Sequence, residues 1–219
     1  MIGWIALAMA TPAAPAQAVE KVAPPAAIVR GHTVRHPVAH LTVRVPKTAT
    51  YIGSERFDLY GVADAEIEVF ADVGRNKRLT RLYWIQFESY WPDKPDLTYN
   101  YTTDRRERHW GTTVWVNDGP GSTRDRGRAG SDREHVQAII ERAGYTIPDE
   151  MMNVRMVQIL DDPKSSGHGR RELMFIYAEG LAKSGKTLAE WKKAPDAAWA
   201  PVGKALVQRA VNAFQVERK

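Results

Sequence analysis

The sequence predicts an α+β domain built on a largely antiparallel sheet, with one mid-chain helix and C-terminal helices packed on one face. Three observations support this class. Segments with strand-like alternation follow one another in the first half of the chain, and the clearest helical segments come late. Strands and helices do not alternate strictly, as they would around a parallel sheet. The 219 residues, 43% of them hydrophobic, suffice for one sizeable core.

Residues 1–18 have the form of a signal peptide. The uncharged apolar run Met1–Ala10 is followed by Ala16-Gln17-Ala18, a small-x-small triplet, although no basic residue precedes the run. The run is too short for a membrane span, which needs about 20 residues. We therefore expect a periplasmic or secreted protein without an integral membrane span; an N-terminal tail is the alternative.

Residues 19–35, with Pro24 and Pro25, predict a Pro/Ala-rich linker. Order is expected to begin near His36, so that one domain covers residues 36–219. From residue 37 to 45 the odd positions are apolar and polar side chains separate them, which predicts a half-buried strand.

The central strands of the predicted core are 65–73 and 79–90. The first alternates apolar with acidic residues, and the second is dense in aromatic side chains, which favour strands and bury large areas. A hairpin turn directly after Val73 would place Ala65 opposite Phe87, so that apolar residues meet on one face.

The remaining strands are predicted from shorter apolar runs, with a charged connection at 104–109 and a mobile loop at 117–130. They are Arg56–Val62, Thr98–Thr103, Thr112–Val116, Met152–Leu160 and Arg170–Glu179.

Capping signals predict the helices. Ser131 and Glu134 have capping-box spacing before an apolar stripe that ends at Gly144. Thr187 repeats the signal before a short helix, and Pro201 is expected as the first residue of a final helix.

Aromatic side chains around a proline-broken loop form the strongest candidate for a binding site. Rings with a polar group beside a loop suit a small apolar or carbohydrate ligand. We therefore predict a binding protein without chemistry of its own. The candidate ligand-binding residues are Trp84, Tyr90, Trp91, Tyr99 and Tyr101.

Two alternatives remain open. One is a hydrolase-type enzyme that uses Glu88 or His109; together with Asp104 and Glu107 these residues could supply an acid/base pair if the loops bring them together. The other is an envelope protein-interaction module that docks through the Arg-rich loop at 124–133. No G-x-S-x-G motif supports a serine nucleophile, so the catalytic residues of an enzyme stay unassigned.

Two further patterns are weaker. Gly180–Thr187 matches the phosphate-binding G-x-x-x-x-G-K-[ST] motif, but a working P-loop needs a parallel sheet around it. His32, His36 and His40 recur every four residues, a spacing that on a strand separates the rings by ~13 Å, too far to share a metal.

Composition limits the partners and cofactors. The formal charge is +5, but basic and acidic residues are interleaved, so we expect no nucleic-acid partner. The chain has no cysteine, which excludes disulfides and thiolate metal sites. We predict no metal and no cofactor; oligomeric state and ligand identity stay open.

Overall fold

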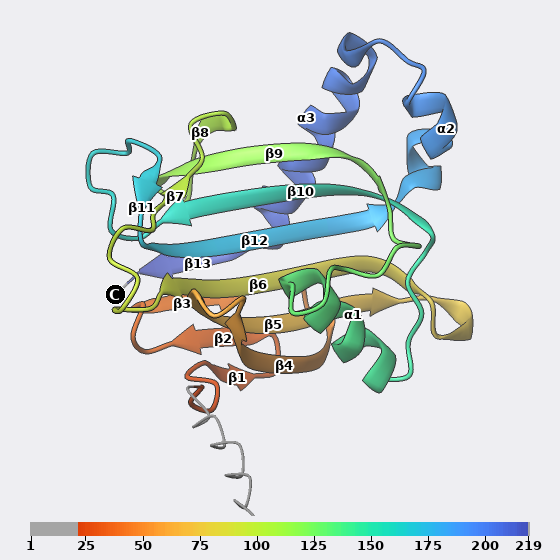
Figure 1. The fold of residues 1–219 in the computed structure, drawn as a ribbon. Coiled ribbons are helices and arrows are strands. Elements are labelled where there is room, and N and C mark those ends of the chain that lie inside the picture. Colours follow the sequence, from red (N-terminus) through yellow and green to blue (C-terminus); the bar gives the residue numbers. More distant parts are fainter. Residues whose placement is uncertain (1–21, 219) are drawn as a thin grey trace, which may run out of the picture.

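A seven-stranded antiparallel sheet forms the middle layer of the protein (Figure 1). The computed structural model describes residues 22–218, so the predicted signal peptide at 1–18 lies outside the described residues. In sheet order the strands are β4 (Thr50–Leu59), β5 (Ala63–Val73), β6 (Leu79–Tyr90), β12 (Arg171–Gly180), β10 (Glu150–Ile159), β9 (Thr112–Ser122) and β8 (Arg105–His109).

Two smaller antiparallel sheets accompany it. One has the order β1 (Ile28–Arg30), β2 (Thr33–His36), β3 (Leu41–Arg44) and β13 (Gln215–Arg218), and the other pairs β7 (Tyr99–Asn100) with β11 (His168–Gly169). Strand β1 and most of β2 fall within the stretch 19–35 that we interpreted as a linker, and Val34 is fully buried. The folded part therefore begins upstream of His36, because hairpin pairing uses backbone groups and needs no long apolar run.

Pairing also forms one strand where none was predicted and extends another. Strand β8 occupies the stretch 104–109 that we expected to be a charged connection, and β9 continues to Ser122, into the predicted loop. The partner strand explains the second case, since Glu150 of β10 pairs with Ser122. Backbone hydrogen bonds carry these ladders whatever side chains they bear.

The helices are α1 (Asp132–Arg142), α2 (Leu188–Trp191) and α3 (Asp196–Ala213), with short 3₁₀ turns η1 (Arg75–Lys77) and η2 (Leu181–Ser184). Thr187 forms the full capping box, and the Ser131 side chain accepts from the Glu134 N–H, so both residues cap their helices as predicted. At Ser131 the reciprocal bond is missing, because the Glu134 carboxylate accepts from the Gly130 N–H. Pro201 lies inside α3 and does not begin it. The helix starts earlier because the Pro195 carbonyl accepts from the Ala198 N–H at 2.8 Å.

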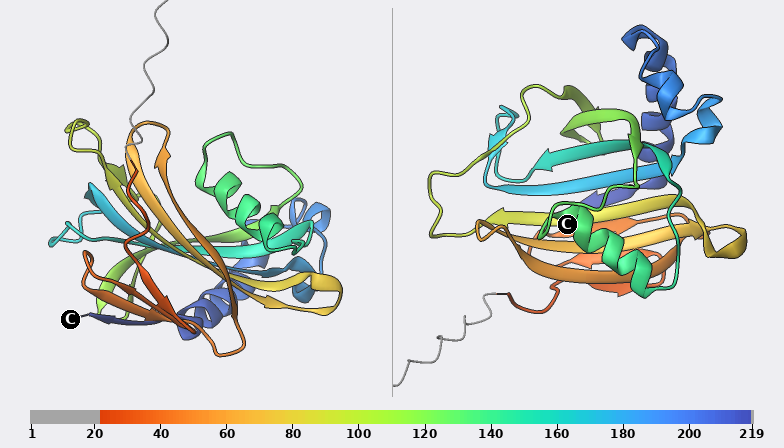
Figure 2. Two further views of the ribbon diagram at one scale, coloured as in Figure 1. Left: turned by 90° about the horizontal axis from the view of Figure 1, so that it is seen from below. Right: turned by 45° about the vertical axis from the view of Figure 1, so that its right-hand side comes forward.

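Helices α1 and α3 cover opposite faces of the large sheet, whereas we had expected the helices on one face. Figure 2 shows α1 on one side of the sheet, and α3 with the four-stranded sheet on the other. Strand β6 explains the difference: Tyr83 and Ile85 pack toward α3, while Leu82 and Trp84 pack toward α1. A strand that is apolar on both sides needs cover on both sides.

A β-bulge shifts the predicted register of β5 and β6 by one residue. Val73 pairs with Leu79 as expected, but Asp72 pairs with Arg81, which leaves Thr80 as the extra residue. Ala65 consequently lies opposite Glu88 instead of Phe87. Because a one-residue slip moves every side chain to the other face, the polar residues of β6 lie on the α1 face.

Candidate functional site

A row of buried polar side chains runs along the α1 face of β6. The Trp84 Nε1 donates to Gln86 Oε1 at 3.0 Å, and Gln86 Nε2 donates to Glu88 Oε2 at 2.7 Å. All three side chains are buried. Buried polar groups need partners, and here neighbours on one strand supply them in a continuous chain.

Glu88 lies directly opposite Glu172 of β12. The two residues are 8% and 2% exposed, and opposed side chains of this kind have Cβ atoms about 5 Å apart. Burial, together with the nearby Glu88 charge, raises the pKa of Glu172 to about 8, and burial also raises the pKa of Glu88. Within residues 22–218, Glu172 Oε2 has no hydrogen-bond partner. The pair therefore favours a state that holds a proton near neutral pH.

Tyrosines surround this acidic pair. The Tyr99 hydroxyl donates to Glu88 Oε1 at 2.6 Å, and its ring stacks on Tyr90 at 4.3 Å between centroids. Tyr101 stacks more loosely on Tyr99, at 6.5 Å. Burial raises the pKa of Tyr99 and Tyr101, so both hydroxyls act as donors toward the acids.

The five predicted ligand-binding aromatics thus separate into groups. Tyr90, Tyr99 and Tyr101 form one stack beside the acidic pair. Trp84 lies further along β6, in the wall of a chamber beneath α1. Trp91 donates from Nε1 to Asp58 at 2.8 Å and lines neither that chamber nor the cleft described below.

The chamber lies between α1 and the large sheet and has a volume of about 360 Å³. Its apolar walls come from β6, β10, β12, α1 and the segment after α1, through Leu82, Trp84, Val136, Ile147, Met151, Met174, Ile176 and Ala178. Polar side chains line the rest of it: Ser122, Thr123, Asp132, Arg133, Gln137, Asn153 and Arg155. Apolar walls with polar groups among them are typical of small-molecule sites.

Contacts with β4 hold α1 over the chamber. Glu55 accepts from Arg142 at 2.6 Å and lies 2.7 Å from His135 Nδ1. The His135 ring also stacks on Phe57, with centroids 3.7 Å apart. The roof of the chamber is therefore anchored along one side to the edge strand of the sheet.

Arg155 connects the chamber with the tyrosines. Its Nη2 donates to Asp104 at 2.7 Å, and its guanidinium lies 5.1 Å from the centroid of the Tyr101 ring. Burial raises the pKa of the neighbouring Asp132. One end of the chamber thus offers both hydrogen-bond donors and acceptors.

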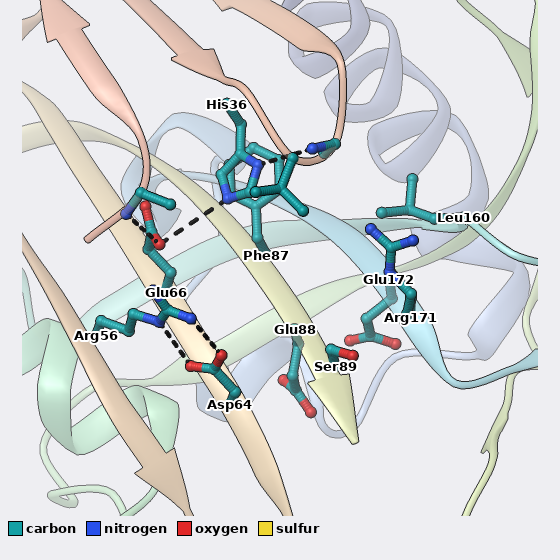
Figure 3. A pocket seen from close by; sticks show the side chains of 13 residues that line it. His36, Arg56, Asp64, Glu66, Phe87, Glu88, Ser89, Leu160, Arg171 and Glu172 are labelled. Atoms are coloured by element: carbon teal, nitrogen blue, oxygen red, sulfur yellow. Dashed lines mark hydrogen bonds and ion pairs between the residues drawn. The ribbon is translucent and has the colours of Figure 1, made fainter. Parts of the chain in front are cut away.

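A second hollow, a cleft of about 330 Å³, opens on the opposite side of the sheet, beneath the β2–β3 hairpin. Figure 3 shows it with Arg56 and Asp64 along one wall and Arg171 along the other. His36 stacks on Phe87 within it, with ring centroids 3.9 Å apart. This cleft had no counterpart in the sequence analysis.

The structure separates Glu88 from His109. The two residues lie on strands with β12, β10 and β9 between them, and the pairing register puts their side chains on opposite faces. His109 instead lies 2.8 Å from Glu107. A general acid and base must act within hydrogen-bond reach of one substrate, so these residues do not form the pair that the hydrolase alternative needs.

The phosphate-loop match at Gly180–Thr187 has the wrong surroundings. Strand β12 before it is antiparallel to both neighbours, and α2 after it has four residues. The Thr187 hydroxyl is engaged with Glu190, and Lys186 Nζ lies 4.7 Å from the Trp191 ring centroid. These residues turn the chain and cap a helix.

The histidine spacing produces no metal site. His36 ends β2, and His40 lies in the turn that leads to β3. In the described part of the chain, no group of three or more histidine, aspartate or glutamate side chains is placed to hold a metal ion.

The arginines of the loop at 124–133 contact groups of the protein itself. Arg124 and Arg126 pair with Asp149 and Glu141. Arg128 lies over the Tyr60 ring, and Arg133 donates to backbone carbonyl groups. The loop therefore presents fewer free cations than its composition suggests.

Sequence reasoning missed Glu172, Asn153 and Arg155. Asn153 and Arg155 interrupt the apolar residues of β10, and Glu172 lies just before the apolar run of β12, which was the available signal. A buried strand position that keeps a charge marks a site worth examining, because an unpaired buried charge is costly.

Comparisons with protein-family models, with curated proteins and with solved structures found no match to this chain. None of the helices within residues 22–218 is both long and apolar enough to cross a bilayer.

Proposed function

We propose that this protein binds a small, largely apolar ligand with a polar end in the chamber beneath α1. The observation that carries this proposal is the lining of the 360 Å³ chamber, where apolar side chains from β6, β10, β12 and α1 meet polar groups that include Asp132, Asn153 and Arg155. Its volume lies in the range that small-molecule sites occupy, about 300–1,000 Å³.

The apolar walls would supply affinity, and the polar groups orientation. Burial of ligand surface against Trp84 and the aliphatic side chains is favourable at about 25 cal/mol per Å². Arg155 and Asn153 offer N–H donors, and Asp132 offers an acceptor. A ligand with a hydroxyl or carboxyl group at one end matches this distribution.

Filling the chamber tests the proposal. Ile176 lines it and is half-buried, so the larger ring of Ile176→Phe should extend into the chamber and abolish binding. Ile52→Phe makes the same change at a half-buried position of β4 outside the chamber lining, and should leave binding unchanged.

Isothermal titration with 1-octanol and glucose supplies the measurement. Binding of 1-octanol to the protein and to Ile52→Phe, with loss in Ile176→Phe, is the expected result. Equal binding to both variants would contradict the chamber as the site. Binding of glucose alone would favour a carbohydrate ligand instead.

Export is a separate part of the proposal. It is supported by the apolar run Met1–Ala10 and the triplet Ala16-Gln17-Ala18. Mass spectrometry of the protein from the periplasm or medium should show a mature chain that starts at residue 19. Recovery of the full chain from the cytoplasm would contradict it.

A further inference from the structure

The cleft beneath the β2–β3 hairpin contains a histidine whose tautomer is determined by its neighbours. The Ala39 N–H donates to His36 Nδ1 at 3.0 Å, so the proton of the neutral ring is on Nε2. The residue is 8% exposed and packs on Phe87. The nearest acidic oxygen to Nε2 belongs to Glu66 at 3.9 Å, beyond hydrogen-bond distance. The imidazole is thus fixed in place with an Nε2–H that makes no hydrogen bond within residues 22–218, and Glu66 is within ion-pair range only if the ring is protonated (Figure 3).

The acceptors on this face of the cleft are already engaged. Asp64 accepts two hydrogen bonds from Arg56, at 2.8 and 2.6 Å. Glu66 accepts from the backbone N–H groups of Ala26 and Ala27, at 2.8 and 2.6 Å. Both carboxylates therefore serve the protein's own structure. Glu88 and Glu172 also line the cleft, but side chains alternate along a strand, and theirs point to the α1 face of the sheet.

The donors are not engaged. Among residues 22–218, neither the Arg171 guanidinium nor the Ser89 hydroxyl has a hydrogen bond or an ion pair, and both residues line the cleft. The two lie directly opposite each other on β12 and β6. His36 lines the same cleft, so the three donors surround one space. A site with engaged acceptors and free donors fits a ligand that accepts hydrogen bonds and carries negative charge.

We propose that this cleft binds a small organic carboxylate, with Arg171, Ser89 and the His36 Nε2–H as the groups that hold its oxygens. The apolar side chains of Val38, Ala39 and Leu160 line the same space, so the rest of the ligand is a short hydrocarbon body. This favours an organic acid over inorganic phosphate, which has no apolar part. The site is separate from the chamber beneath α1 and does not depend on it.

Titration calorimetry with butanoate, butanamide, butylammonium and inorganic phosphate tests the proposal. Butanoate should bind about tenfold more tightly than butanamide, because charged hydrogen bonds contribute more than neutral ones. Butylammonium carries the wrong charge and phosphate has no hydrocarbon body, so both should also bind about tenfold more weakly. Arg171→Met should weaken butanoate binding by about tenfold. Arg106→Met removes an exposed arginine from β8, outside the cleft, and should change nothing.

The His36 ring provides a second readout by NMR. Four charged groups face it: Glu66 and Asp64 raise its pKa, while Arg56 and Arg171 lower it, and burial makes the net direction downward. Bound butanoate adds a negative charge, so the His36 pKa should rise in the complex. Ring resonances are assigned with His36→Gln.

Three results would overturn the proposal. They are equal affinities for butanoate and butanamide, tighter binding of phosphate than of butanoate, and a His36 ring that does not respond to butanoate. The chamber variant Ile176→Phe should bind butanoate normally, so failure of one site is distinguishable from failure of the other.

Discussion

Glu88 and Glu172 lie directly opposite each other on β6 and β12, both buried, with tyrosines in place of a basic partner. Two carboxyl groups in such a position do not both ionise readily, because burial and mutual repulsion disfavour the second charge. Tyr99 and Gln86 satisfy the Glu88 oxygens. The pair makes the stability of the sheet depend on pH.

We predict that the free energy of unfolding falls as pH rises from about 4.5 to 8. The pKa of Glu172 is raised to about 8 in the folded protein, so the stability that its proton provides is present below the unfolded value of 4.5 and is lost as pH passes through 8. Each pKa unit corresponds to about 1.4 kcal/mol. Glu172→Gln should therefore gain roughly 1–3 kcal/mol at pH 8 and flatten the dependence.

Urea unfolding between pH 4 and 9 measures this effect. Glu141→Gln, which changes an exposed glutamate of α1, should keep the slope of the unmodified protein. Identical slopes for Glu172→Gln and the unmodified protein would show that this carboxyl does not carry the dependence.

We predict that Gly203→Ala destabilises the protein. An added Cβ would lie 2.2 Å from an Asp118 carboxylate oxygen and 2.8 Å from Trp199 Nε1, where α3 approaches β9. The clash should disturb the Trp199–Asp118 hydrogen bond and cost about 1–3 kcal/mol, which exceeds the gain in helix propensity. Gly180→Ala has no such neighbours and should be nearly neutral in thermal unfolding. A Gly203→Ala variant as stable as the original would contradict this close approach.

We predict that Ser131→Ala lowers stability by about 1 kcal/mol. The Ser131 hydroxyl accepts from the Glu134 N–H at 3.2 Å at the start of α1. Ser89→Ala removes a hydroxyl that has no partner in the described part of the chain, so its unfolding free energy should stay the same. Equal losses in both variants would indicate that the cap does not contribute.

We predict that ATP with Mg²⁺ does not stabilise the protein. The residues of the phosphate-loop match follow an antiparallel strand and cap a four-residue helix. Lys186→Ala should cost about 0.5–1 kcal/mol, through loss of its contact with the Trp191 ring. A thermal shift on addition of ATP that disappears in Lys186→Ala would restore the nucleotide interpretation.

Local signals predicted much of the secondary structure. The helix caps at Ser131 and Thr187 are formed as expected, because a cap depends on groups within three residues of one another. The alternation of 65–73 and the aromatic run of 79–90 correspond to β5 and β6. The central, antiparallel part of the fold was therefore predictable.

The candidate sites were harder to predict from the sequence, because they depend on one inserted residue and on the pairing of distant strands. Thr80 forms a β-bulge in β6, so the row of polar side chains that ends at Glu88 points to the other face of the sheet from the one expected. Glu172 reaches Glu88 through the pairing of strands more than 80 residues apart in the chain. No periodicity in either strand contains that information.

By itself, the sequence determined the strand-rich α+β class and the starts of α1 and α2, since alternation and capping act over a few residues. Tertiary structure alone decided which faces are buried, which acids meet, and where the chamber and the cleft open. The physical reason is that strand register and sheet order decide which way each side chain points and which residues lie close together, and pairing between distant strands sets both.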